Sequence, residues 1–217
     1  LSKHILLPRI LEEITMFDEG QLFSYTRLQQ TYNRFGRLGA LRSTQIILNE
    51  RPDTNIIDAE IQMYPNLVNS FSFQPEGTNT AGNLGAAASI TYSNKNIFRG
   101  SELFSLSVRG AFEAITGLEG YNNSNYIEFG AEGKIDIPRL LAPLLTKKFR
   151  RRQEAVTQFS VSYNMQNRPE FRRRVFRGGI KYKWSNASKK DTYTFDLIDL
   201  NYISMPWISD TFRIRYL

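Results

Sequence analysis

The sequence contains no cysteine and one histidine, His4, in 217 residues. The absence of cysteine excludes a disulfide scaffold, a thiol-based zinc site and a cysteine nucleophile. The chain also lacks a G-x-S-x-G elbow, a Walker loop and the spacing of a metal-binding motif, and His4 stands at the start of a predicted helix. We therefore expect a protein that is not an enzyme and that holds no metal or cofactor.

Long apolar runs are missing as well. No stretch approaches the ~18 to 20 apolar residues that a membrane-spanning helix needs, and no signal peptide is visible. Residue 1 is leucine, and the first segment already has the pattern of a folded domain. We interpret the sequence as an internal fragment or a processed chain, so the absence of targeting signals carries no weight.

The charges are unbalanced, because 28 Lys and Arg face 21 Asp and Glu, giving a net charge of +7. Such an excess is typical of proteins that meet nucleic acid or an anionic membrane surface. Much of it lies in two runs, residues 147–152 and 172–174, which fall between periodic segments. We predict both runs to be turns or loops, which disfavours one continuous basic face.

Helical spacing dominates residues 1–48. Pro8 can open a first helix, and Ser24 has the chemistry of an N-cap for a second. A single apolar stripe at i, i+4, i+7 and i+10 marks this second helix: Leu28, Tyr32, Phe35 and Leu38. Strands are predicted over residues 44–49 and 56–64, on either side of the turn signal E-R-P-D-T-N. The predicted order is helix, helix, strand, strand.

From residue 69 onward the period changes to two. Segments of about ten residues alternate between apolar or small residues and polar ones: residues 84–93, 104–113, 127–136, 158–166 and 176–184. Strands of ~9 to 11 alternating residues are the signature of a transmembrane β-barrel. A soluble sandwich also alternates, but ordinary strands average about 5 to 6 residues. The apolar face is also rich in Gly, Ala, Tyr and Phe, and the opposite face carries full charges.

Two features mark the ends of this pattern. Tyr92, Trp184 and Tyr202 stand where apolar runs stop, which predicts an aromatic girdle. The run over residues 193–202 changes phase, because Phe195 and Leu197 do not alternate in step with Ile198. This predicts either a β-bulge or a wrong strand assignment.

The first strand of the alternating region, residues 69–76, is short and contains Pro75. Proline lacks a backbone donor and is confined to sheet edges or bulges. Two interpretations stay open. The strand is a weakly paired edge that can template another strand, or it simply ends at a loop.

Longer stretches resemble a known family. Residues 32–41 (Y-N-R-F-G-R-L-G-A-L), followed by two strands, resemble the end of a POTRA domain, the periplasmic repeat of BamA/TamA-type outer-membrane assembly factors (bacterial surface antigens). Residues 73–85 (F-Q-P-E-G-T-N-T-A-G-N-L-G) and 94–102 (N-K-N-I-F-R-G-S-E) are similar to the opening of that family's barrel. Residues 159–172 and 196–206 resemble the TamL branch, a lipoprotein relative of TamA.

The resemblance implies a mainly β fold in two parts. Residues 1–66 are expected to be the C-terminal part of a POTRA domain, with its first strand missing. Residues 67–217 are expected to form about seven antiparallel strands, the N-terminal portion of a barrel of roughly sixteen strands. Seven strands cannot close, so the chain is not expected to be the whole working unit.

The implied function is assembly or translocation of proteins into the bacterial outer membrane, with the N-terminal part in the periplasm. A barrel that opens laterally beside its first strand would guide clients. The implied partners are outer-membrane lipids, nascent outer-membrane proteins and a TamB-like, periplasm-spanning protein, with lipid transport as a further role of that pair. No nucleic acid is expected.

Four sets of candidate residues follow. In the turn motif, Gly100 allows a positive φ, Asn96 can satisfy backbone groups, Phe98 can anchor at the interface, and Arg99 can reach headgroups or a carboxylate. The full sets are the lateral-gate strand Phe71, Phe73, Pro75 and Glu76, the turn motif Asn96, Phe98, Arg99, Gly100 and Glu102, the POTRA edge Ile57, Ala59 and Ile61, and the aromatic girdle Tyr92, Trp184 and Tyr202.

The sequence has three rival interpretations of function. A passive outer-membrane pore or adhesin fits the strand pattern, but the helix-helix-strand-strand unit ahead of it argues against this alternative. A soluble basic protein that stacks nucleic acid on aromatic side chains is disfavoured, because the aromatics share the apolar face. A glycosidase could pair Glu128, Glu132 and Asp136, which in a barrel would instead line the lumen.

Overall fold

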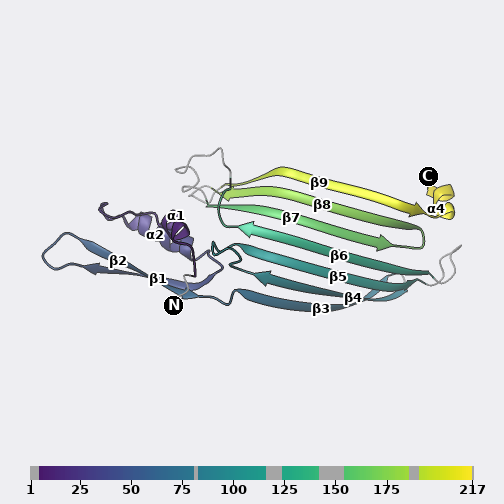
Figure 1. Cartoon of the computed structure of the whole chain (residues 1–217), viewed down its shortest axis with the longest axis horizontal. Coiled ribbons are helices and arrows are strands. Elements are labelled where there is room, and N and C mark those ends of the chain that lie inside the picture. Colours follow the sequence, from purple (N-terminus) through teal and green to yellow (C-terminus); the bar gives the residue numbers. More distant parts are fainter. Residues whose placement is uncertain (1–4, 81–82, 116–123, 142–153, 186–190, 217) are drawn as a thin grey trace.

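The computed structural model describes residues 5–80, 83–115, 124–141, 154–185 and 191–216, and it is mainly β (Figure 1). His4 and residues 147–152 lie outside this part. The elements in chain order are α1 (Pro8–Ile14), α2 (Tyr25–Phe35), β1 (Leu41–Glu50), β2 (Ile57–Pro65), β3 (Asn69–Thr80), β4 (Asn83–Asn94), β5 (Leu103–Ile115), β6 (Ser124–Ile137), β7 (Glu154–Asn167), β8 (Phe171–Ser185), β9 (Thr192–Ile208) and α4 (Asp210–Tyr216). None of the described helices is long and apolar enough to cross a membrane.

The first unit comprises α1, α2 and the antiparallel hairpin β1–β2, in the predicted order of helix, helix, strand, strand. Pro8 is the first residue of α1, and Ser24 occupies the N-cap of α2 without a side-chain capping bond. Apolar side chains from the helices and the hairpin converge on one buried cluster: Leu6, Phe35, Leu38, Ala40 and Leu41. We call residues 5–65 the N-terminal unit.

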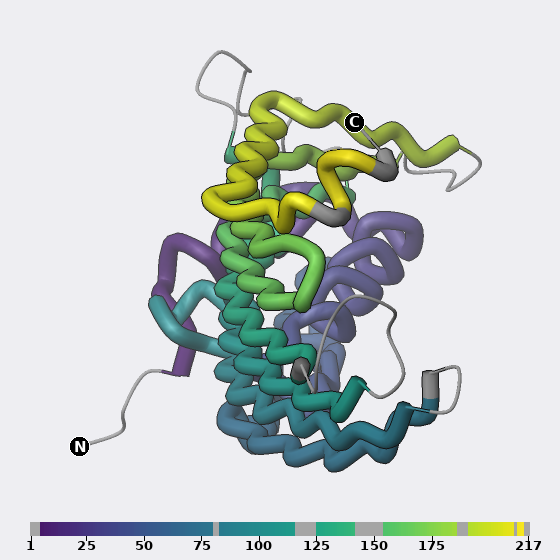
Figure 2. Tube along the Cα trace, turned by 90° about the vertical axis from the view of Figure 1, so that its right-hand side faces the viewer, coloured from purple at the N-terminus to yellow at the C-terminus, as the bar shows by residue number. Residues whose placement is uncertain are grey.

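Strands β3 to β9 form one antiparallel sheet in which every strand pairs with its neighbours in sequence. Neighbouring strands run in opposite directions, and the N-terminal unit lies at one end of the sheet (Figure 1). Viewed along the strands, the sheet curves, and the regions of β3 and β9 bend toward the same side (Figure 2). Among the described strands the sheet is open, because β3 and β9 each have one neighbour.

The two faces of this sheet have opposite chemistry. Rows of apolar and small residues cross all seven strands on one face, and one such row is Phe71, Tyr92, Leu106, Gly133, Val161, Gly178 and Leu200. These apolar side chains are exposed, with Phe71 at 71% and Leu200 at 59%. No described element covers them. We call this surface the outer face.

The opposite face is polar and less exposed, as expected for the inside of a curved sheet. Three ion pairs lie on it: Glu76 with Arg109 at 2.8 Å, Lys134 with Asp136 at 3.1 Å, and Lys181 with Asp196 at 3.2 Å. Serine and threonine hydroxyls also bond between neighbouring strands on this side, for example Thr91 to Ser107 at 3.1 Å. We call it the inner face.

Strand β9 is longer than predicted and carries the bulge that the phase change indicates. Ile198 is opposite Ile180, whereas Asp196 is opposite Lys181, so Leu197 is the extra residue. Its apolar runs on either side of Leu197 therefore belong to the same outer face. A second irregularity lies between the pairs that Trp207 and Ser204 make with β8.

The prediction of a turn over residues 172–174 is wrong. The three arginines lie inside β8, where Arg172 pairs with Asn167 of β7 and Arg174 with Met165. Because side chains alternate along a strand, Arg172 and Arg174 share the outer face with Phe176, and Arg173 points to the inner face. Three consecutive charges have no period, which is why the sequence pattern did not reveal a strand here.

Candidate functional site

The segment between β4 and β5, residues 95–102, lies where the N-terminal unit meets the sheet, and we call it the junction turn. Its backbone is unusual at two non-glycine positions, because Arg99 has φ of 60° and Ser101 has φ of 61°. Gly100, between them, does not have a positive φ, so the conformational reason predicted for this glycine is wrong. Space is the reason, because a Cβ at Gly100 would overlap Oε1 of Glu102.

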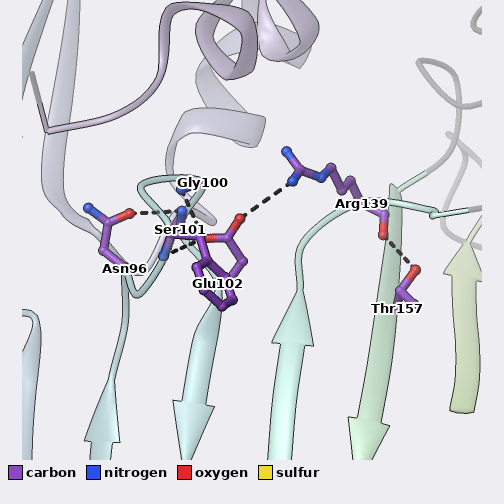
Figure 3. A network of polar contacts seen from close by, with 7 residues as sticks. Asn96, Gly100, Ser101, Glu102, Arg139 and Thr157 are labelled. Carbon is purple, nitrogen blue, oxygen red and sulfur yellow. Dashed lines mark hydrogen bonds and ion pairs between the residues drawn. The ribbon is translucent and has the colours of Figure 1, made fainter.

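Glu102 holds the junction turn from within. Its side chain is 2% exposed, and Oε2 accepts hydrogen bonds from the backbone N–H of Gly100 at 2.9 Å and of Phe98 at 3.3 Å (Figure 3). A buried carboxylate is costly unless donors surround it, and bonds to a charged acceptor are stronger than neutral ones. Glu102 therefore fixes the path of the turn around its own carboxylate.

The turn also binds the N-terminal unit. Asn96 accepts a bond from the N–H of Ser101 at 3.0 Å and donates one to the carbonyl of Ile5 at 2.8 Å. The N–H of Ala40, a member of the buried cluster, donates to Oγ of Ser101 at 3.0 Å. The N–H of Leu7 donates to the carbonyl of Arg99 at 3.0 Å. Two parts of the N-terminal unit, the residues before α1 and the residue before β1, are thus anchored on one turn of the sheet.

On its other side the turn reaches the start of the segment between β6 and β7. Nη2 of Arg139 lies 3.5 Å from Oε1 of Glu102. The carbonyl of Arg139 accepts a bond from the hydroxyl of Thr157, which is fully buried, at 2.8 Å (Figure 3). The N–H of Leu141 donates to the same hydroxyl at 2.9 Å. The junction turn, the segment after β6 and strand β7 are therefore linked in one polar network.

A second contact joins the N-terminal unit to the far part of the sheet. Arg37, just after α2, forms an ion pair with Glu154, the first residue of β7. A cleft of about 340 Å³ lies beside this pair, lined by the end of α2 and the ends of β7 and β8. The N-terminal unit is therefore held at two places on the sheet.

The two remaining residues of the predicted turn motif face outward from this network. Phe98 is 60% exposed and Arg99 is exposed as well. For Arg99 the structure gives a backbone contact to Leu7 and no carboxylate partner among the described residues. Anchoring at an interface and reaching headgroups stay predictions for these two side chains.

The predicted lateral-gate strand is β3, and Pro75 does not end it. The strand continues to Thr80, and Pro75 lies opposite Ala88 of β4. Phe71 and Phe73 are exposed on the outer face. A proline is tolerated here because, among the described strands, β3 pairs with β4 alone. The interpretation that Pro75 ends the strand is wrong, and the role of β3 as an edge that templates another strand stays a prediction.

Glu76 provides a side-chain link between this edge strand and the sheet. Its two carboxylate oxygens accept bonds from both terminal nitrogens of Arg109 on β5, at 2.8 and 2.9 Å. The pair passes over Ala87 of β4, which is buried. A bidentate pair of this kind holds a defined geometry, so it braces β3 across its neighbour.

The predicted edge residues of the N-terminal unit divide between core and solvent. Ile61 packs against the buried cluster, whereas Ile57 and Ala59 are exposed on β2. Next to them, Asp58 pairs with Arg51 across the hairpin, and its hydrogen bond and charge raise the pKa of Arg51. Among the described strands β2 pairs with β1 alone, so its second edge is open.

The predicted girdle residues lie at different heights on the sheet. Tyr92 lies near the end of β4 beside the N-terminal unit, and its hydroxyl donates to Asn69 at 2.9 Å. Trp184 lies at the corresponding end of β8 and stacks on Tyr193, with ring centroids 5.6 Å apart. Tyr202 lies within β9, opposite Phe176 and closer to the other end of the sheet.

Sequence reasoning missed most of the polar network. Arg139, Thr157, Ser101 and Arg109 hold the turn or the edge strand, and none of them was a candidate. Thr157 and Arg109 occupy ordinary polar positions in alternating strands, and nothing in a pattern distinguishes them from solvated neighbours. Only the proline before Arg139 signals the end of a strand there. Among the described residues no group of acidic or histidine side chains could hold a metal ion.

Comparison with known proteins gives little direct guidance. No family model and no curated protein matches the chain. Among solved structures, the chain is similar to the crystal structure of BamA from Haemophilus ducreyi lacking POTRA domains 1-3, at a TM-score of 0.40 and 10% identity. That similarity covers 91% of this chain and 45% of the BamA chain, so the chain spans less than half of that protein's length. Any inference about function rests on the chain's own residues.

Proposed function

We propose that the chain is part of a bacterial outer-membrane β-barrel, with β3 to β9 as membrane-spanning strands. The supporting observation is the inverted chemistry of the sheet. Apolar rows lie exposed on the outer face, and the ion pairs lie on the inner face. In water this distribution is unfavourable, because exposed apolar area costs about 25 cal/mol per Å². In a bilayer it is the arrangement that barrels have.

Within that class we propose a BamA/TamA-type assembly factor of the TamL branch. The N-terminal unit would be the last part of a periplasmic POTRA domain, and β3 would be the first barrel strand. The sequence stretches over residues 73–85 and 94–102 support the family, and those over residues 159–172 and 196–206 support the branch. The clients would be nascent outer-membrane proteins, and a TamB-like periplasm-spanning protein would be the partner.

The proposed mechanism uses the free edge of β3. An edge strand offers unpaired N–H and C=O groups to an incoming strand, and β-augmentation of this kind suits a client that is itself made of strands. Pro75 removes one donor and weakens pairing along this edge. The Glu76–Arg109 pair keeps β3 attached to the sheet while its other edge exchanges partners.

The test is a reversible lock. In the full-length protein reconstituted in liposomes, Phe73→Cys is paired with a cysteine on the strand that faces the free edge of β3. This part of the protein has no native cysteine to interfere. Oxidation should stop insertion of an unfolded outer-membrane protein, and reduction should restore it. The control is a Gly110→Cys and Phe129→Cys pair, which joins two strands that are already partners.

Insertion that continues with β3 locked would refute the gating mechanism. A passive pore or adhesin is the second candidate, favoured by the polar inner face alone. It predicts that neither lock changes insertion and that the oxidised protein still conducts small solutes. An assembly factor predicts that the β3 lock, and not the control lock, abolishes insertion.

A further inference from the structure

The arginines within β8 have no role in the function proposed above. Arg172 and Arg174 lie on the outer face, in the first residues of β8. This end of β8 lies away from the N-terminal unit (Figure 1). Cations on an apolar face are expensive unless something compensates them. Their position therefore calls for a physical explanation.

The position of the two arginines along the strand direction gives part of this explanation. Along β8 the outer face carries apolar or glycine residues from Trp184 back to Phe176, and the arginines follow. Ten steps from Trp184 to Arg174 cover about 34 Å of strand. With a tilt of ~35 to 45°, this projects to about 26 Å, which matches the ~25 Å apolar band of membrane barrels. Arg174 thus lies at the border of the band, and Arg172 lies just beyond it.

The neighbours of the arginines fit such a border. Trp207 of β9 lies opposite Arg172, and the guanidinium carbon of Arg172 is 5.5 Å from the centre of its ring. Arg174 donates to Oδ1 of Asn167 at 2.8 Å. An aromatic ring beside polar side chains is typical of the membrane–water interface. The stacked pair of Trp184 and Tyr193 occupies the opposite border.

Within the described residues these two cations have neutral partners only: Arg172 lies over Trp207, and one terminal nitrogen of Arg174 donates to Asn167 and to the carbonyls of Gln166 and Arg173. Three cations of the inner face have carboxylate partners on that face. Within the described residues, neither Arg172 nor Arg174 has a carboxylate partner, and Arg172 is exposed. Both guanidiniums therefore keep donors that can turn to an anion from outside the protein.

We propose that Arg172 and Arg174, with Trp207 beside them, bind the phosphate of an anionic lipid headgroup at the membrane border. This inference rests on the proposed membrane location of the sheet. Two guanidiniums two residues apart on one face can converge on one phosphate, and planar guanidinium groups bind phosphate oxygens in pairs. Trp207 would pack against the upper part of the lipid chain.

The experiment uses the full-length protein in detergent micelles, titrated with phosphatidic acid or phosphatidylcholine and followed by native mass spectrometry. Arg172→Gln with Arg174→Gln should weaken binding of phosphatidic acid by roughly tenfold or more, since a basic residue near an anionic lipid surface contributes about 1 kcal/mol. Binding of phosphatidylcholine should not change. Arg173→Gln is the matched control, because this side chain lies between the two arginines in sequence and on the opposite face.

An equal loss for Arg173→Gln, or unchanged binding of phosphatidic acid by the double variant, would overturn the proposal. If the double variant does not fold, Arg172→Gln alone serves, because its side chain is exposed and should give a smaller loss in the same direction. Protease protection of β8 in liposomes is measured in parallel. If β8 of the native protein is not protected, the membrane location is refuted. If β8 is protected but the native protein does not prefer phosphatidic acid to phosphatidylcholine, the headgroup site alone is refuted.

Discussion

The N-terminal unit and the seven-stranded sheet use apolar residues in opposite ways. In the first, Phe35 is 1% exposed and packs with Leu38 and Leu41 in a buried cluster. In the second, Phe71 and Leu200 project from the outer face with no described element over them. One region is built to exclude water from its inside, and the other to present apolar surface on its outside. The junction between them is polar.

The difference shows that burial alone does not identify a core. A soluble sheet of this size would hide its apolar face under helices or a second sheet. Here three ion pairs lie on the less exposed inner face, and the large apolar side chains lie on the exposed outer face. The surrounding medium, and not another protein layer, is expected to complete the second region.

The largest difference between the two regions is expected from a substitution in the buried cluster. Phe35→Ala should cost the N-terminal unit about 3 to 5 kcal/mol, because it removes a fully packed ring and leaves a cavity. Hydrogen exchange should accelerate in α2 and β1 and stay unchanged in β5 to β8. Equal acceleration in both regions would mean that they unfold as one body.

A charge on either face of β7 tests the medium around the sheet. Val161→Arg places a cation in the middle of the outer face and should destabilise the sheet in lipid by roughly 2 to 4 kcal/mol. Ser162→Arg, one residue along and opposite Glu132 on the inner face, should have little effect. Urea unfolding in liposomes measures both. Similar costs on the two faces would contradict a lipid-facing outer surface.

The junction turn depends on the missing side chain of Gly100. Gly100→Ala should lower local stability by about 1 to 3 kcal/mol, since the carboxylate of Glu102 must move away from its donors. Gly110→Ala is the control, because a Cβ there meets nothing within 4 Å. Hydrogen exchange of the backbone amides of residues 38–41 measures this loss of local stability. Unchanged protection would show that the turn does not anchor the unit.

The smallest effect is expected at the hairpin of the N-terminal unit. Arg51 and Asp58 form an exposed pair with two hydrogen bonds, so Arg51→Ala should lower the stability of the hairpin only slightly. High salt should remove most of the difference between native and variant proteins, because salt screens exposed charges. A difference that persists in high salt would indicate lost packing instead.

Much of the architecture follows from periodicity, and most of the contacts do not. Alternation predicted most strands of the sheet, and the change of phase near residue 197 indicated either a bulge or a wrong assignment, because each of these signals depends on neighbouring residues. Strand ends extended beyond the predicted bounds, as at β3, since pairing can continue through residues without a pattern. The role of Glu102 depends on Arg139, which is 37 residues away, and no local pattern reports such a distance. The arginines of β8 interrupt the apolar pattern at its border.

The contacts of the junction turn have a consequence for the order in which the protein is built. Asn96 and Ser101 bond to Ile5 and Ala40 across separations of 91 and 61 residues. During synthesis the N-terminal residues emerge first, so the buried cluster can form while the turn does not yet exist. The docking sites at Ile5 and Ala40 must therefore wait for β4 and β5 to pair and bring the turn to them. Docking of the N-terminal unit therefore shows that the first strands of the sheet have already paired.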